Sequence, residues 1–232
     1  MLKKYPAENY GKANHGWLKS LFHFSFAEYY NRNRMNFGVL RVVNDDIVKP
    51  QTGFDMHPHR DMEIVSYVVD GDLTHGDSMG NKNTISRGHI QYMSAGTGVV
   101  HSEHNFGKGD LRFLQIWIQP NQKQLEPFYG DHRFDWNLRS NRLLHMVSPQ
   151  AGNAPVQINA DVNIYALELD AGHSLEFPVA AGRQVYVVQI EGAADVNGLK
   201  LTAKDALESV DESLLMKATE KSHLLFLEMK KA

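Results

Sequence analysis

The chain of 232 residues contains no cysteine. It therefore has no disulfide framework, no thiolate nucleophile, no ligands for an iron–sulfur cluster and no cysteine-built zinc site. Any metal ion that the protein binds must be held by histidine, aspartate or glutamate.

Long apolar runs and an excess of positive charge are also missing. No run reaches the roughly 18 apolar residues of a membrane-spanning helix, and no signal-peptide core follows the basic start, so we expect no membrane partner and a cytoplasmic location. The net charge is −3 at pH 7, with no long block of like charge, which argues against direct nucleic-acid binding. Hydrophobic residues make up 42% and charged residues 22%, a balance typical of a folded chain with a sizeable core.

The sequence favours an all-β fold. Short segments alternate between apolar and polar residues, and Gly, Asn, Asp and Pro separate them at regular intervals, as in an antiparallel sandwich or barrel. Two stretches, Asn14–Ser20 and Ala27–Asn31, are instead expected to form short helical turns. The expected strands are Gly38–Val43, Met62–Val69, Ile90–Ser94, Leu111–Ile118, Val162–Leu169, Gln184–Ile190 and Leu224–Met229.

A weak internal repeat predicts two similar domains. Val68-Val69-Asp70-Gly71 is similar to Gln189-Ile190-Glu191-Gly192, and in each copy a glycine turn and a basic turn follow. The alternation breaks up between Pro120 and Pro155. We therefore expect domains at residues 1–148 and 149–232.

Two pairs of potential metal ligands occur in the first half. His57 and His59 are two residues apart, as are His101 and Glu103. Alternate side chains of a strand share a face, so each pair can converge on one ion if the two strands lie side by side. Three imidazoles and a carboxylate suit a divalent transition metal with positions left open for water or substrate, as in catalytic sites.

The same alternation leaves the identity of the carboxylate open. Asp61 and Glu63 share the parity of His57 and His59, so Glu63 competes with Glu103. His104 has the opposite parity to His101 and should face away. His75 and His89 have no paired partner, and we expect an ordinary core or surface role for each.

The spacing of these residues resembles the two motifs of the cupin superfamily, whose small β-barrels carry a metal in the mouth. Longer strings are more specific and resemble the pirin family, closest to its bacterial quercetinase-like members. The similarity is strong over roughly residues 10 to 120. The strings are His57-Pro58-His59-Arg60-Asp61-Met62-Glu63, Ser94-Ala95-Gly96-Thr97-Gly98-Val99-Val100-His101-Ser102-Glu103, and the N-terminal segments Trp17–Ser20, Phe24–Phe26 and Phe37–Asp46.

The resemblance implies a bicupin, with two antiparallel jelly-roll barrels in one chain. The N-terminal barrel would hold one divalent transition metal through His57, His59, His101 and Glu103. Iron is favoured, and manganese, nickel, cobalt, copper and zinc are alternatives. Glu63 then has a supporting role. The C-terminal barrel would lack a metal, which leaves His173 and His223 as structural or surface residues.

The resemblance also implies an activity: a quercetin 2,3-dioxygenase-like oxidoreductase that uses O2 to open a flavonol such as quercetin and releases carbon monoxide. Glu103 would be the catalytic residue that accepts the proton of the flavonol 3-hydroxyl. The apolar mouth is expected to involve Phe54, Met56, Met93 and Trp117. One alternative is a metal-dependent, redox-sensing regulatory protein that acts through a protein partner; a different cupin reaction at the same site is another.

Overall fold

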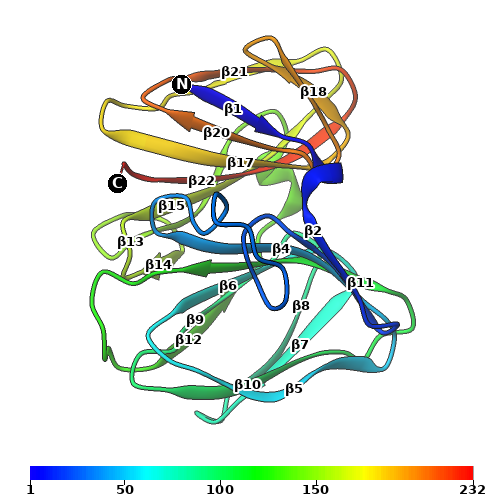
Figure 1. Ribbon diagram of the computed structural model, residues 1–232, viewed down its shortest axis with the longest axis vertical. Coiled ribbons are helices and arrows are strands. Elements are labelled where there is room, and N and C mark those ends of the chain that lie inside the picture. The colour runs from blue at the N-terminus through cyan, green and yellow to red at the C-terminus, as the bar shows by residue number, and fades with distance from the viewer. Residues whose placement is uncertain (232) are drawn as a thin grey trace. The chain divides into compact units, whose positions relative to one another are not determined.

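The computed structural model describes residues 1–231 and consists almost entirely of antiparallel strands and turns (Figure 1). It contains two short 3-10 helices and no α-helix within that range. The predicted all-β class is confirmed. No helix among the described residues has the length and apolar character needed to cross a bilayer.

The two expected helical turns are wrong. Residues 14–20 form a hairpin, in which Gly16 adopts a φ of 83° and its backbone N–H donates to the side chain of Asn14. Around Ala27, which has a φ of 48°, Phe26 and Tyr29 exchange backbone hydrogen bonds. A left-handed residue interrupts both stretches, so neither can complete a helical turn.

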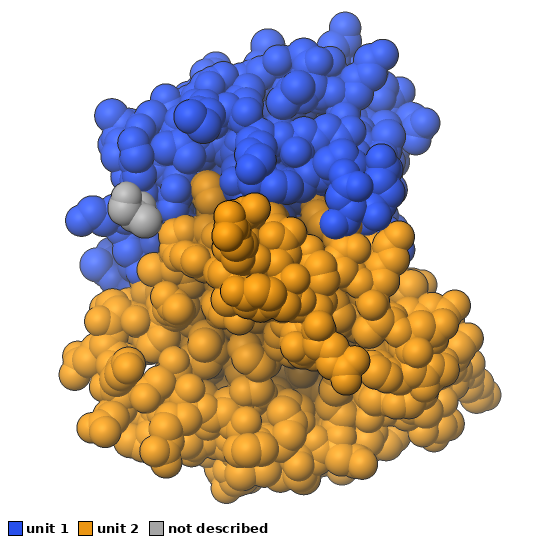
Figure 2. Space-filling view, viewed as in Figure 1, with its two compact units in different colours: residues 1–9, 135–157, 161–232 blue, residues 10–134, 158–160 orange. Residues whose placement is uncertain are grey.

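The chain divides into two compact units, coloured separately in Figure 2. Residues 10–134 and 158–160 form what we call the N-terminal unit. Residues 1–9, 135–157 and 161 onward form the C-terminal unit. This division differs from the expected one at residues 148 and 149, because β1 (Leu2–Tyr5) pairs with β20 (Ala206–Val210) and β13 (Leu144–Pro149) pairs with β15 (Val162–Leu169). Pairing across 200 residues leaves no local signal in the sequence.

The N-terminal unit has a seven-stranded sheet, in the order β12-β9-β6-β11-β4-β3-β2, and a four-stranded sheet, in the order β5-β10-β7-β8. Its strands are β2 (Gly11–Asn14), β3 (Leu18–Phe22), β4 (Leu40–Val48), β5 (Thr52–His59), β6 (Glu63–Asp70), β7 (Asp72–Asp77), β8 (Lys82–Ser86), β9 (Ile90–Ser94), β10 (Val99–Asn105), β11 (Leu111–Ile118) and β12 (Phe128–His132).

The C-terminal unit repeats this arrangement, with sheets ordered β1-β20-β17-β22-β15-β13-β14 and β16-β21-β18-β19. Its remaining elements are η1 (Ala7–Asn9), η2 (Trp136–Arg139), β14 (Val156–Ile158), which ends in the N-terminal unit, β16 (Ser174–Phe177), β17 (Arg183–Glu191), β18 (Ala193–Val196), β19 (Leu199–Thr202), β21 (Leu214–Ala218) and β22 (Ser222–Lys230).

The two strand orders match one another. The run β9-β6-β11-β4 corresponds to β20-β17-β22-β15. The smaller sheets correspond as well, because β5-β10-β7-β8 matches β16-β21-β18-β19 strand for strand. The repeated Gly71 and Gly192 occupy equivalent turns, with φ of 79° and 75°. A Cβ at either position would lie within 3 Å of a backbone carbonyl oxygen, so both turns require glycine. The internal repeat therefore reflects two copies of one fold.

The interiors of both units combine buried apolar and buried polar side chains. In the C-terminal unit, a continuous cluster of buried apolar side chains includes Leu167, Val187, Met216 and Phe226. In the N-terminal unit, the buried polar side chains include several histidines and carboxylates. Side chains of these types can bind metal ions or exchange protons, so this unit is where a site is expected.

Candidate metal centre

Three histidines converge on the inner side of the four-stranded sheet. β5 and β10 are antiparallel neighbours, at the bottom of the view in Figure 1, and His101 lies directly opposite His57. One ring nitrogen from each of His57, His59 and His101 lies within 4.8 Å of the other two. The predicted alignment of the two strands is therefore confirmed for the histidines.

A β-bulge adjusts the faces of β5. His101 pairs with His57, but Glu103 pairs with Phe54. A step of two residues along β10 therefore corresponds to a step of three along β5, which means that β5 contains one extra residue. The extra residue reverses the alternation. Phe54 can therefore line the same cavity as His57, whereas Met56 is 55% exposed.

The three rings meet the requirements for metal ligation. His57 Nδ1 is 2.7 Å from the backbone oxygen of Asp55; if it donates there, the lone pair of Nε2 is available to an ion. Nε2 of His59 and both nitrogens of His101 are buried without a hydrogen-bond partner. Burial and the neighbouring imidazoles lower the pKa of His59 to about 4 and that of His101 to about 3. The rings of His59 and His101 are therefore neutral at pH 7, as metal binding requires.

Glu103 enters from β10 and is held by three side chains of the larger sheet. Ser66 Oγ donates to Oε1 at 2.8 Å and Gln91 Nε2 donates to the same oxygen at 2.7 Å, while Gln115 Nε2 donates to Oε2. A carboxylate offers about four lone-pair directions. Three donors thus leave about one direction for a metal ion or for a proton. In this arrangement Glu103 lies outside the set of three histidines that converge within 4.8 Å.

The residues that hold Glu103 form a row across the sheet. Asn44 on β4 pairs with Gln115 on β11, which pairs with Ser66 on β6, which pairs with Gln91 on β9. The register of the four strands places these polar residues side by side in one row on the same face of the sheet. Nothing in the local sequence reveals this row, because each member is an isolated polar residue on a strand and only the pairing of strands assembles them.

The expectation that Asp61 and Glu63 share the face of the histidines is wrong. β5 ends at His59, and Asp61 adopts a φ of 50° in the turn that leads to β6 in the other sheet. Alternation does not carry across such a turn. Glu63 is fully buried and accepts hydrogen bonds from Tyr92 and from residues 159 and 160.

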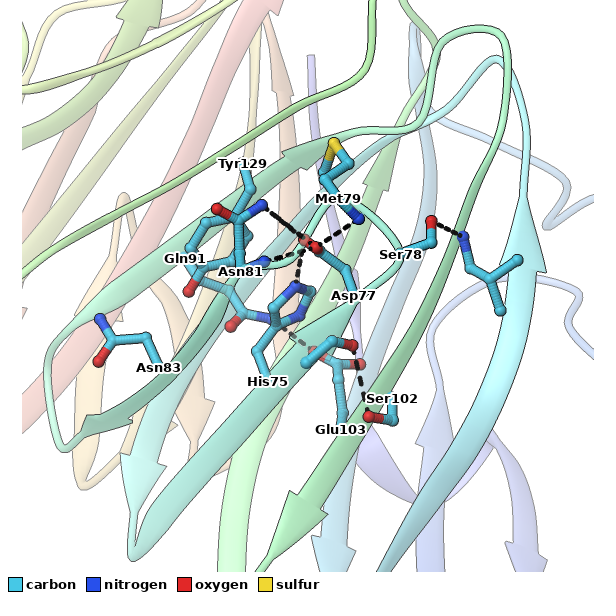
Figure 3. Close-up of polar contacts among 12 residues, drawn as sticks. His75, Asp77, Ser78, Met79, Asn81, Asn83, Gln91, Ser102, Glu103 and Tyr129 are labelled. Carbon is cyan, nitrogen blue, oxygen red and sulfur yellow. Dashed lines mark hydrogen bonds and ion pairs between the residues drawn. The ribbon is translucent and has the colours of Figure 1, made fainter.

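His75, for which an ordinary core or surface role was expected, lies close to the candidate ligands. It is fully buried on β7, with its ring centroid 5.4 Å from that of His101, and stacks on Tyr129 at 4.4 Å. Its Nε2 is 2.9 Å from the carboxylate of Asp77, which also accepts two bonds from the side chain of Asn81 (Figure 3). The spacing of His75 and Asp77, two residues apart on one strand, was a usable signal.

His104, which was expected to face away from the candidate ligands, does so. His104 stacks on Phe106 and lies 3.4 Å from the carboxylate of Asp55, on the side of the sheet opposite the three-histidine cluster. The alternation argument therefore holds on β10, which keeps its regular pleat at this point.

A cavity of about 520 Å³ opens beside the histidines. Of the four expected lining residues, Phe54 and Trp117 are confirmed, and Trp117 packs edge-on against His59 at 4.9 Å. The prediction is wrong for Met93, which is buried in a core cluster. It is also wrong for Met56, which is exposed and lines a different depression. The lining residues are His15, Trp17, Leu18, Ser20, Phe22, Phe26, Ala27, Asn44, Asp46, Phe54, His57, His59, Glu103, Gln115 and Trp117.

Comparison with protein families identifies both halves of the chain. Residues 5–118 match the family model described as pirin, and residues 145–229 match the one described as quercetinase C-terminal cupin domain. A protein of Escherichia coli K12 named quercetin 2,3-dioxygenase is 40% identical over 210 residues, which cover 90% of each chain. A pirin-like protein of Caulobacter vibrioides is 40% identical over 216 residues, or 93% of each chain.

Solved structures agree with these matches. The bacterial pirin YhhW of Escherichia coli, crystallised in complex with nickel(II), superposes with a TM-score of 0.94 and 37% identity over the full length of both chains. The similarity therefore extends across both units, and that relative binds a transition metal.

Proposed function

The chain belongs to the pirin family of cupin proteins, and we propose that it is a metal-dependent dioxygenase that opens flavonols such as quercetin and releases carbon monoxide. The observation that carries this proposal is the convergence of three imidazoles, two of which, His57 and His59, lie on the wall of a cavity lined by aromatic rings. Its volume of about 520 Å³ lies within the range of small-molecule sites, about 300–1,000 Å³.

His57, His59 and His101 would hold one divalent transition metal, with Glu103 as the fourth ligand. The unpartnered ring nitrogens and the mixed nitrogen and oxygen donors fit such an ion. When bound, the ion would supply Lewis-acid stabilisation of a deprotonated substrate oxygen and a place where substrate and O2 meet.

The aromatic walls would bind and orient the substrate. Trp117 is fixed by edge-on contacts with His59 and with Phe26 at 5.3 Å, and Trp17 packs edge-on against Phe54 at 5.2 Å. Flat rings of this kind favour a planar aromatic ligand through offset or edge contacts.

Glu103 would accept the proton of the flavonol 3-hydroxyl. Ser66, Gln91 and Gln115 already occupy three of its lone-pair directions, so proton transfer and metal ligation compete for the remaining one. Glu103 can perform both roles only in sequence, or by releasing one of its three donors.

Oxygen uptake tests the proposal. Metal-free protein is reconstituted with each candidate metal in turn and given a panel of flavonols. We expect uptake above that of the same metal free in buffer, and no uptake without metal. Turnover at the level of free metal would contradict the proposal, and capture of a protein partner in one oxidation state of the metal would favour the regulatory alternative.

A further inference from the structure

Two buried acceptors on β4 lack hydrogen-bond partners and border the cavity. Oδ1 of Asn44 and Oδ1 of Asp46 have no partner, and each residue is only 3% exposed. Both residues line the cavity, two positions apart on one strand and therefore on the same face. An unpaired buried acceptor is costly, so a pair of them in one cavity wall calls for a donor from a ligand.

The neighbouring side chains are committed elsewhere. Gln115, opposite Asn44 on β11, donates to Glu103. Arg112 forms two hydrogen bonds with Asp45, which points to the other side of β4. The protein thus places cationic and amide donors close by without directing them at these two oxygens.

The environment of Asp46 is consistent with a group that meets a ligand. Burial, together with the charges of Asp45 and Glu103, raises the pKa of Asp46 to about 7, although a hydrogen bond with Ser20 opposes the shift. Phe113 lies opposite Asp46 on β11 and Ser20 opposite it on β3. Asp46 therefore has the Ser20 hydroxyl as a polar neighbour, while its Oδ1 stays without a partner.

We propose that Asn44 and Asp46 bind a hydroxyl-bearing ring of the substrate, through hydroxyl groups other than the one that faces the three histidines. This inference rests on the proposed function and narrows its substrate class to flavonols hydroxylated on a ring besides the 3-position. Such hydroxyls donate to buried acceptors that would otherwise stay unpaired, whereas an unsubstituted ring cannot. Sites of this kind discriminate strongly against ligands that lack the matching group.

A pair of ligands tests this on the unaltered protein. Quercetin carries hydroxyls on both outer rings, and 3-hydroxyflavone carries only the 3-hydroxyl. Calorimetric titration of the metal-loaded protein under nitrogen measures affinity without turnover. We expect quercetin to bind about ten- to a hundredfold more tightly, the range expected when buried acceptors gain or lose a donor. Burial of apolar surface alone would favour 3-hydroxyflavone, so equal or reversed affinities would overturn the inference.

Two variants locate the effect. Asn44→Leu and Asp46→Leu each replace an acceptor by an apolar group of similar size. Each should lower the ratio of the two affinities about three- to tenfold by removing one of the two discriminating bonds, and the double variant should bring the ratio close to one. If one variant fails to fold, the other provides the test. Phe22→Leu, on the same cavity wall, is the control: it should weaken both ligands and keep their ratio.

The outcomes separate the inference from the proposed function. A preference for quercetin that is undiminished in both leucine variants would overturn the inference while the dioxygenase proposal stands. If neither flavonol binds the unaltered protein, the proposed function is contradicted and the inference falls with it.

Discussion

Glu63 and Glu103 lie on opposite faces of the sheet that β6 and β9 form. Gln91 donates to Glu103, whereas its neighbour Tyr92 donates to Glu63 at 2.5 Å. Consecutive residues of a strand point to opposite faces of the sheet. Gln91 and Tyr92 of β9 therefore donate hydrogen bonds to the two carboxylates from opposite faces. The sequence left these glutamates in competition for one role, and the structure gives each a separate set of donors.

Glu103→Gln should lose nearly all flavonol turnover even where metal remains bound, because an amide cannot accept the substrate proton. Steady-state oxygen uptake, normalised to the metal content of each sample, measures the loss. Near-normal turnover in Glu103→Gln would remove this residue from the role of base.

Glu63→Gln should instead act on stability. Its carboxylate accepts from Tyr92, from both nitrogens of Asn159 and from the backbone of Ala160, and an amide nitrogen would face some of these donors with another donor. We expect a loss of about 1–3 kcal/mol in the free energy of unfolding, measured by urea denaturation, with metal content unchanged. Full stability together with loss of metal would show that Glu63 is a ligand after all.

His57→Ala and His101→Ala should each abolish tight metal binding, because the remaining ligands cannot maintain the coordination geometry. Metal analysis of the unaltered protein should find one transition-metal ion per chain at full loading. His104→Ala is the matched control: it lies on the same strand as His101 but faces the other way, and its metal content should match the unaltered protein. Two ions per chain, or normal content in the first two variants, would refute this assignment.

The stability of the metal-free protein should fall at acid pH, in part through His23. This ring stacks on Tyr10, and burial lowers its pKa from 6.5 to about 3, an effect that Asp45 only partly opposes. Between those pH values the unfolded chain binds a proton that the folded chain does not, so each pH unit below 6.5 costs about 1.4 kcal/mol of folding free energy.

His23→Phe keeps the stacked ring and removes this titration. The free energy of unfolding, measured in urea at pH 7, 6 and 5, should therefore fall less steeply with pH in the variant than in the unaltered protein. Equal slopes would mean that His23 takes up its proton in the folded state as readily as in the unfolded one.

The parts of the fold that local alternation specifies were predictable from sequence. Ile90–Ser94, Leu111–Ile118 and Val162–Leu169 begin and end as expected, and the two strands that carry the candidate ligands pair as their histidines suggested. The predictions that were wrong or missing depend on how the strands pair in space. The bulge that turns Phe54 inward and the register that aligns Gln115 with Ser66 arise only when strands pair.

The missed neighbours of the site have the same explanation. His75 stands 26 residues before His101, and nothing in its immediate sequence reveals that β7 and β10 are adjacent. Asn44 and Asp46 interrupt an apolar strand, a pattern visible in the sequence, but only the structure shows that they border the cavity rather than solvent.

The most direct test of the central claim is the ratio of carbon monoxide released to O2 consumed when the metal-loaded protein turns over quercetin. Opening of the flavonol ring incorporates both atoms of O2 into the aromatic product and expels one ring carbon as carbon monoxide. We predict a ratio close to one, with neither gas changing in metal-free protein or in His57→Ala. Oxygen uptake without carbon monoxide would contradict the claim, because it would show that quercetin is merely oxidised and its ring is not opened.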